Sequence, residues 1–195
     1  MDSPLRMIPN NPAEILLSLD QELDHEVSLV LFGRAALCLG FDAAPPAFQA
    51  TQDVDAIIPL SQLPGLTEDT GFWDAVERTN TALSPKGLYI THLFCEDQVF
   101  LRPDWEQHLR PIHTVATHFL KLFRPHPVDL ILTKMMRGND SQDMEDITFL
   151  VRQNDFTAAG LEAAFESVRM PDVPELREAF QQALPLVRDI LRTSS

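Results

Sequence analysis

The 195-residue sequence has few basic residues: 15 lysines and arginines stand against 29 aspartates and glutamates, for a formal net charge of −14. Nonspecific nucleic-acid binding needs basic side chains that displace counterions from phosphates, so this composition argues against it. The same charge disfavours an anionic membrane surface. It remains compatible with a divalent cation, a small substrate or a basic protein partner.

Long hydrophobic runs are missing as well, and we expect no secretory leader. No stretch approaches the roughly 18 apolar residues that span a bilayer, and residues 1–7 lack the basic start and apolar core of a secretory signal. Cysteine is limited to Cys38 and Cys95, both in apolar settings. We therefore expect a cytoplasmic protein in which both are buried free thiols, with a disulfide between them as the alternative.

The sequence does contain strand-like apolar runs that alternate with helical spacing. We expect strands at 27–32, 53–58, 88–94 and 119–123, and another at 99–101 paired with 88–94 through a tight turn at 96–97. A turn is expected at 63–66. The order predicts an α/β or α+β core at residues 1–125, with a helical region at 126–195 packed on it. Expected helices lie at 11–25 with Asn11 as the N-cap, 34–39, 72–83, 127–136, 143–152, 158–168 and 174–191.

Two aspartates on the second predicted strand are the first candidates for chemistry. Successive strand residues point to opposite faces, so Asp53 and Asp55 share a face. Adjacent carboxylates repel unless they share a cation, a basic residue or a proton. Gly33 closes the preceding strand, where free backbone N–H groups at a helix start suit a phosphate. A solvated edge strand and an ordinary turn are the structural alternatives.

Several motifs, in order, resemble the nucleotidyltransferase superfamily, above all its bacterial AbiEii-like and DUF6036-type members. The opening motif combines Phe-Gly-Arg-Ala-Ala at 32–36 with Thr-Gln-Asp-Val-Asp at 51–55. Residues 88–94 and 96–102 are similar to that group's third strand and hairpin. Residues 129–138 are similar to its helical Lys-x-x-Arg-Gly segment, which two aspartates follow. The resemblance implies a small mixed sheet flanked by helices.

The resemblance also implies a magnesium or manganese site beside a nucleoside triphosphate, because metal ions held on carboxylates neutralise and position phosphates. Lys134 and Arg137 have an ordinary structural alternative, which is pairing with Asp143 and Asp146 or with the helix C-terminus. The implied catalytic residues are Asp53, Asp55 and Asp97; the implied metal ligands are Asp53, Asp55, His92 and Glu96; the implied nucleotide-binding residues are Gly33, Arg34, Thr51, Lys134 and Arg137.

Two main functional hypotheses follow from the resemblance. The first is transfer of a nucleotidyl group from the metal-bound triphosphate to an acceptor. The second is a catalytically decayed binding or regulatory component, as in toxin–antitoxin pairs, with a basic protein partner. It is motivated by Arg34, Gln49 and His92, which stand where the family pattern has a small residue, an arginine and a carboxylate. A metal-dependent phosphohydrolase would use the same carboxylates, and the sequence does not indicate an oligomeric state.

Overall fold

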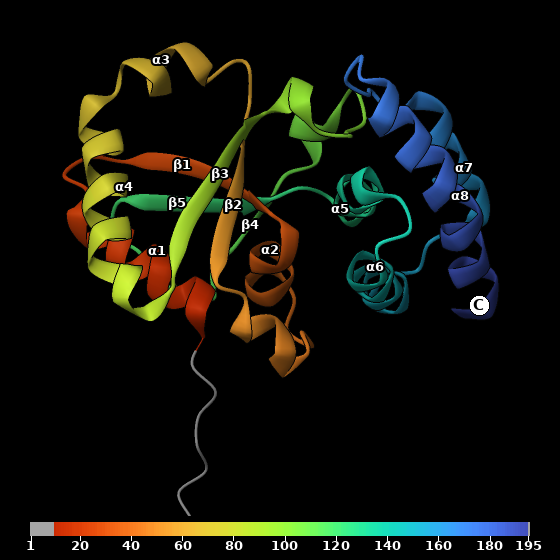
Figure 1. Ribbon diagram of the computed structural model, residues 1–195, viewed down its shortest axis with the longest axis horizontal. Coiled ribbons are helices and arrows are strands. Elements are labelled where there is room, and N and C mark those ends of the chain that lie inside the picture. The colour runs from red at the N-terminus through yellow and green to blue at the C-terminus, as the bar shows by residue number, and fades with distance from the viewer. Residues whose placement is uncertain (1–9, 195) are drawn as a thin grey trace, which may run out of the picture.

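The computed structural model describes residues 10–194, and a five-stranded mixed sheet of order β3-β2-β1-β5-β4 organises it (Figure 1). β1 pairs antiparallel with β2 and parallel with β5, β3 runs parallel to β2, and β4 runs antiparallel to β5. The predicted mixed sheet flanked by helices is confirmed. The strands are β1 (Val27–Phe32), β2 (Asp53–Ile58), β3 (Tyr89–Cys95), β4 (Arg110–Pro111) and β5 (Leu120–Arg124).

The central strand, β1, is the apolar run expected from the sequence. Leu29, Val30 and Leu31 are almost completely buried, because this strand has neighbours on both edges and helices over the sheet. α1 packs on α4 and β2, while α2 contacts both β1 and β2. The helices of this part are α1 (Asn11–Glu22), α2 (Gly33–Gly40), α3 (Leu63–Glu68) and α4 (Thr70–Leu83).

The C-terminal third is helical, as predicted, and lies to one side of the sheet (Figure 1). α5 packs on α2 and α6, and α8 packs on α6 and on the 3-10 turn Met135–Arg137. The predicted boundary after residue 125 falls between β5 and α5. Among residues 10–194, no helix is long and apolar enough to cross a membrane. The helices are α5 (Pro127–Lys134), α6 (Ser141–Gln153), α7 (Ala158–Ser167) and α8 (Pro174–Ser194).

One predicted strand is wrong. Residues 96–97 do not form a hairpin turn, because Glu96–Gln98 is a 3-10 helix that leads the chain away from β3. The segment 99–101 is buried instead as an irregular chain, and Leu101 makes an isolated bridge to Arg169. The apolar run therefore fills a core without joining the sheet.

Smaller differences concern element ends and the cysteines. Asn10, not Asn11, caps α1, since its side chain accepts from the Ala13 N–H at 3.1 Å, and the helix ends before residue 25. The predicted turn at 63–66 is the start of α3, and β4 was not predicted. Cys38 and Cys95 are free thiols, as expected, but both are half-buried rather than buried.

Candidate functional site

The turn after β1 brings the chain close to the carboxylate pair. Phe32 ends β1 and stands opposite Asp55 in the antiparallel register. Gly33 then begins α2 with φ of +64°, a left-handed conformation that glycine adopts without steric cost. A Cβ atom at Gly33 would lie 3.5 Å from the Asp55 Oδ2 atom. Since 3.5 Å is an ordinary van der Waals distance, glycine is favoured here by the backbone conformation rather than by lack of space.

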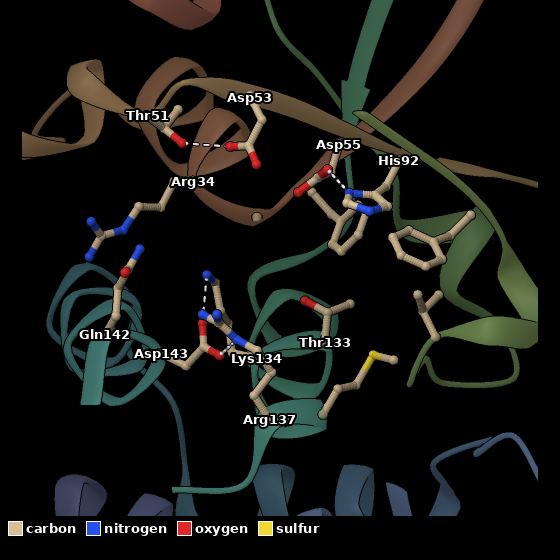
Figure 2. A pocket seen from close by; sticks show the side chains of 15 residues that line it. Arg34, Thr51, Asp53, Asp55, His92, Thr133, Lys134, Arg137, Gln142 and Asp143 are labelled. Atoms are coloured by element: carbon tan, nitrogen blue, oxygen red, sulfur yellow. Dashed lines mark hydrogen bonds and ion pairs between the residues drawn. The ribbon is translucent and has the colours of Figure 1, made fainter. Parts of the chain in front are cut away.

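Asp53 and Asp55 face one cavity of about 360 Å³, as their alternation along β2 predicts (Figure 2). The Thr51 hydroxyl donates to Asp53 Oδ1 at 2.9 Å. Asp55 Oδ1 accepts from the Thr91 hydroxyl at 3.0 Å and lies 3.2 Å from His92 Nδ1. Among residues 10–194, the second oxygen of each carboxylate has no such partner, which is the arrangement that a shared cation would require.

The electrostatics of Asp55 also favour a cation. Burial raises the pKa of Asp55, and the charge of Asp53 raises it further. The hydrogen bonds from Thr91 and His92 oppose that rise without cancelling it. A nearby cation stabilises the ionised carboxylate relative to the neutral acid. A cation bound beside Asp55 would therefore offset the cost of keeping this buried side chain ionised.

The opposite wall of the cavity carries basic side chains from α5 and the turn that follows it. Lys134 Nζ lies 2.9 Å from Asp143 Oδ1 and 2.7 Å from Asp146 Oδ2. Arg137 Nε donates to Asp143 Oδ2 at 2.5 Å. Burial alone would raise the pKa of Asp143, but the Arg137 hydrogen bond and the Lys134 charge hold it below its usual range. The hydrogen bond to Asp143 raises the pKa of Arg137.

Arg34 extends from α2 to the same acidic cluster and does not pair with Asp55. Its guanidinium binds Asp146, with Nε and Nη2 at 3.2 and 3.1 Å from Oδ1. It also lies over the Phe48 ring, 5.2 Å from the centroid. Gln142 lines the cavity beside it (Figure 2). Asp146 thus holds two cations, one from α2 and one from α5, which ties the sheet region to the helical region.

Two predicted residues lie outside this cavity. The Glu96 carboxylate accepts from the Leu60 N–H at 3.0 Å and from Arg169 Nη2 at 2.9 Å, so it joins three parts of the chain. Asp97 is exposed on the adjacent 3-10 helix. The cavity does bring together Gly33, Arg34, Thr51, Asp53, Asp55, His92, Lys134 and Arg137.

The donor set suits a magnesium ion that arrives with its ligand. Across residues 10–194, no three or more His, Cys, Asp or Glu side chains are placed to hold a metal by themselves. Two carboxylates are nevertheless enough for Mg²⁺ when phosphate oxygens and waters complete its shell. Asp53 and Asp55 fit that description, whereas the imidazole of His92 is a poorer ligand for this ion.

The sequence did not point to several of the residues that line the cavity. Phe94 lies two residues after His92 on β3, so strand alternation could have placed both on one face. Gln142 carries no such signal, because its place depends on how α6 packs against α5. The lining residues that were not predicted are Phe32, Phe94, Val99, Thr133, Met136, Gln142 and Asp143.

The mixed sheet and its flanking helices define an α/β protein, and the family comparison describes it as nucleotidyltransferase-like. The chain belongs to the DUF6036 family, described as a nucleotidyltransferase of unknown function, and matches it over residues 13–159. The resemblance found in the motifs is thereby confirmed. No curated protein and no solved structure matches the chain significantly.

Proposed function

We propose that this protein transfers a nucleotidyl group from a magnesium- or manganese-bound nucleoside triphosphate to an acceptor. The observation that carries the proposal is the single cavity in which the Asp53–Asp55 pair faces three basic side chains. Phosphoryl and nucleotidyl transfer depend mainly on positioning and charge neutralisation. Carboxylates for the metal and cations for the phosphates are the two sets of groups that this chemistry needs.

The carboxylates of β2 would hold the metal ion, which when bound neutralises phosphate charge and aligns the reacting oxygens. Asp53 is oriented by Thr51, and Asp55 by Thr91 and His92. These hydrogen bonds hold both carboxylates in place before the ligand arrives, which reduces the entropy lost on binding. The Gly33 turn keeps the backbone beside Asp55 free of a side chain.

The cations of the opposite wall would bind phosphate oxygens. Arg137 is the most accessible, because its side chain is 56% exposed whereas that of Lys134 is 10% exposed. Asp143 and Asp146 hold these groups in fixed positions but also compete with a ligand for their charge. A triphosphate would therefore contact Arg137 directly, and it would interact with the charge of Lys134 mainly at longer range.

Isothermal titration calorimetry with Mg²⁺ and each nucleoside triphosphate tests the proposal. We expect binding that requires the metal and is lost in Asp53→Asn and Asp55→Asn. Asp74→Asn is the matched control, since Asp74 is an exposed aspartate of α4 outside the cavity. Binding that survives both strand substitutions would exclude the proposed metal site.

A second candidate function is a binding or regulatory role on the same fold, as in a toxin–antitoxin-like pair. It is supported by the basic side chains of the cavity, which are already neutralised by Asp143 and Asp146. A basic protein partner would suit the net charge of −14. Two results together would favour this function over catalysis. The Asp53→Asn/Asp55→Asn double variant would still bind a basic partner in stoichiometric amounts, and the wild type would bind no triphosphate.

A further inference from the structure

The cavity has two chemically different ends (Figure 2). Arg34, Thr51 and Gln142 lie at one end, and the Asp53–Asp55 pair separates them from the other. The second end, called here the aromatic end, is lined by Phe32, His92, Phe94, Val99 and Met136. A ligand that fills the whole cavity must therefore be charged at one end and apolar at the other.

The rings of the aromatic end contact one another. Phe32 and Phe94 meet edge to face, with centroids 5.7 Å apart and planes at 74°. The His92 imidazole stacks on Phe94 at 5.2 Å and 17°. Phe32 ends β1, whereas His92 and Phe94 lie within β3, and these two strands flank β2 and its two aspartates. Their position is therefore set by the same sheet that positions the carboxylates.

The packing beneath these rings leaves them partly open to the cavity. Phe32, Phe94 and Met136 are half-buried and pack on a small core that includes Val99 and Trp105. That core supports them from one side. Aromatic faces and a methionine sulfur are adaptable surfaces for a flat ring. The arrangement differs from an ordinary core edge, because these side chains line the cavity that contains the carboxylate pair.

Within the described part of the chain, few hydrogen-bonding groups line this end, and two of their polar atoms already have partners. The Thr133 hydroxyl, which also lines the cavity, donates to the Leu130 carbonyl at 2.8 Å. His92 Nδ1 contacts Asp55. A hydroxyl-rich group such as a sugar would replace few of its water contacts here. A flat aromatic group loses few hydrogen bonds to water here, because it makes its contacts through the face of the ring.

We propose that the aromatic end is the subsite for the nucleobase of the triphosphate, and that it binds the base by its face with little discrimination between bases. The inference rests on the proposed function, since it places the phosphates between the carboxylate pair and the basic wall. Stacking tolerates any base because every base has a π-face. The protein would then select its substrate by the triphosphate and by stacking, and use more than one nucleotide.

The test compares ligands that differ only in the base. With Mg²⁺ present, calorimetry on the full chain measures the affinities of ATP, GTP, CTP, UTP and inorganic tripolyphosphate. We expect each nucleotide to bind about tenfold more tightly than tripolyphosphate, which corresponds to one stacked base. Phe94→Leu should remove most of that advantage and leave tripolyphosphate binding unchanged. Met136→Ala is a second variant with the same expectation.

Phe119→Leu is the matched control, because Phe119 is also half-buried and also contacts a histidine ring, His118, yet lies outside the cavity. If tripolyphosphate binds as tightly as the nucleotides, the base subsite is wrong while the proposed phosphate and metal site stands. If one base binds more than about 100-fold better than the others, edge recognition replaces stacking. If neither tripolyphosphate nor any nucleotide binds, the proposed function fails and this inference fails with it.

Discussion

Asp146 is the residue on which the basic wall of the cavity depends. Its side chain is fully buried and holds both Lys134 and Arg34. Removing one member of a buried ion pair leaves an uncompensated charge in a medium that solvates it poorly. We expect Asp146→Asn to lower the free energy of unfolding by about 3 kcal/mol, measured by urea denaturation.

The neighbouring residue provides the control for that measurement. Glu145 lies 3.9 Å from Arg34 with a side chain that is 77% exposed, and exposed pairs contribute little. Glu145→Gln should leave the unfolding midpoint nearly unchanged. Equal losses in the two variants would mean that overall charge, rather than the buried pairing, accounts for the effect.

Asp20 makes a second residue-scale prediction, this time about pH. Its carboxylate accepts from the backbone N–H groups of His118, Phe119 and Leu120 at 2.7 to 2.8 Å. Burial alone would raise the pKa of Asp20, but these hydrogen bonds lower it below the usual aspartate range. The carboxylate joins α1 to the start of β5. Asp20→Asn should cost about 1–3 kcal/mol at pH 7, because a neutral amide satisfies fewer N–H donors.

The sign of the pH dependence follows from the lowered pKa of Asp20. Its contribution is fully present above the unfolded-state pKa of about 4 and is lost as the pH falls through the lower folded-state value. The stability difference between wild type and Asp20→Asn should therefore be constant from pH 7 to about pH 5 and shrink below about pH 4. A difference that stays constant down to pH 3 would contradict this assignment.

Local patterns predicted the residues whose positions are set by nearby sequence. Strand alternation placed Asp53 and Asp55 on one face, and the suggested structural pairing of Lys134 and Arg137 with Asp143 and Asp146 is observed. The contact between Arg34 and Asp146 was beyond such reasoning, because the two residues are 112 positions apart. The same packing is what keeps Arg34 away from Asp55.

At the scale of elements, Gly138 determines how α8 meets the basic wall. It ends the turn that carries Arg137, with φ of +68°, and a Cβ there would lie 2.9 Å from Gln182 Oε1 and 3.4 Å from Ala179 Cα. Gly138→Ala therefore combines backbone strain with a collision against α8. We expect a loss of about 1–3 kcal/mol in chemical denaturation.

Gly65→Ala is the control for that substitution. Gly65 lies within α3, and an added Cβ would meet nothing within 4 Å. Alanine is the better helix former, so this variant should be neutral or slightly more stable. If Gly138→Ala were equally harmless, the close contact between the turn and α8 would not limit stability.

The element that sequence reasoning misjudged shows where pattern alone fails. Val99, Phe100 and Leu101 are all almost fully buried, and a continuous apolar run of this length is compatible with a buried strand or with irregular core chain. The 3-10 helix before it sends the chain away from the sheet. The long helices were predicted closely, because amphipathic spacing and capping residues are local signals.

At the scale of the whole molecule, the sheet order could not be read from the sequence. β5 is parallel to β1 although Leu120 and its partner Val27 are separated by most of the core region. Neither the apolar run of β1 nor the short mixed sequence of β5 offers a local cue to its partner strand. The pairing follows from the joint burial of the strands and helices in one core. α5, which follows β5, then contributes Lys134 to the cavity.

The acidic excess of the molecule leads to a prediction about salts. With a net charge of −14, like-charge repulsion opposes the compact state, so sodium chloride should raise the unfolding temperature by screening. At equal ionic strength, magnesium chloride should raise it further if Asp53 and Asp55 bind the ion. The additional stabilisation follows RT ln(1 + [Mg²⁺]/Kd), and differential scanning fluorimetry over a magnesium titration measures it.

The Asp53→Asn/Asp55→Asn double variant separates binding from screening. It removes two neighbouring negative charges that repel each other. One of them is on Asp55, whose pKa is raised by burial and by the charge of Asp53. Without magnesium, the double variant should therefore unfold at a higher temperature than the wild type. Its response to sodium and magnesium should be the same at equal ionic strength. A magnesium-specific shift that persists in this variant would locate the ion elsewhere. A wild type that responds equally to both salts would show that the pair does not hold magnesium in the absence of a triphosphate.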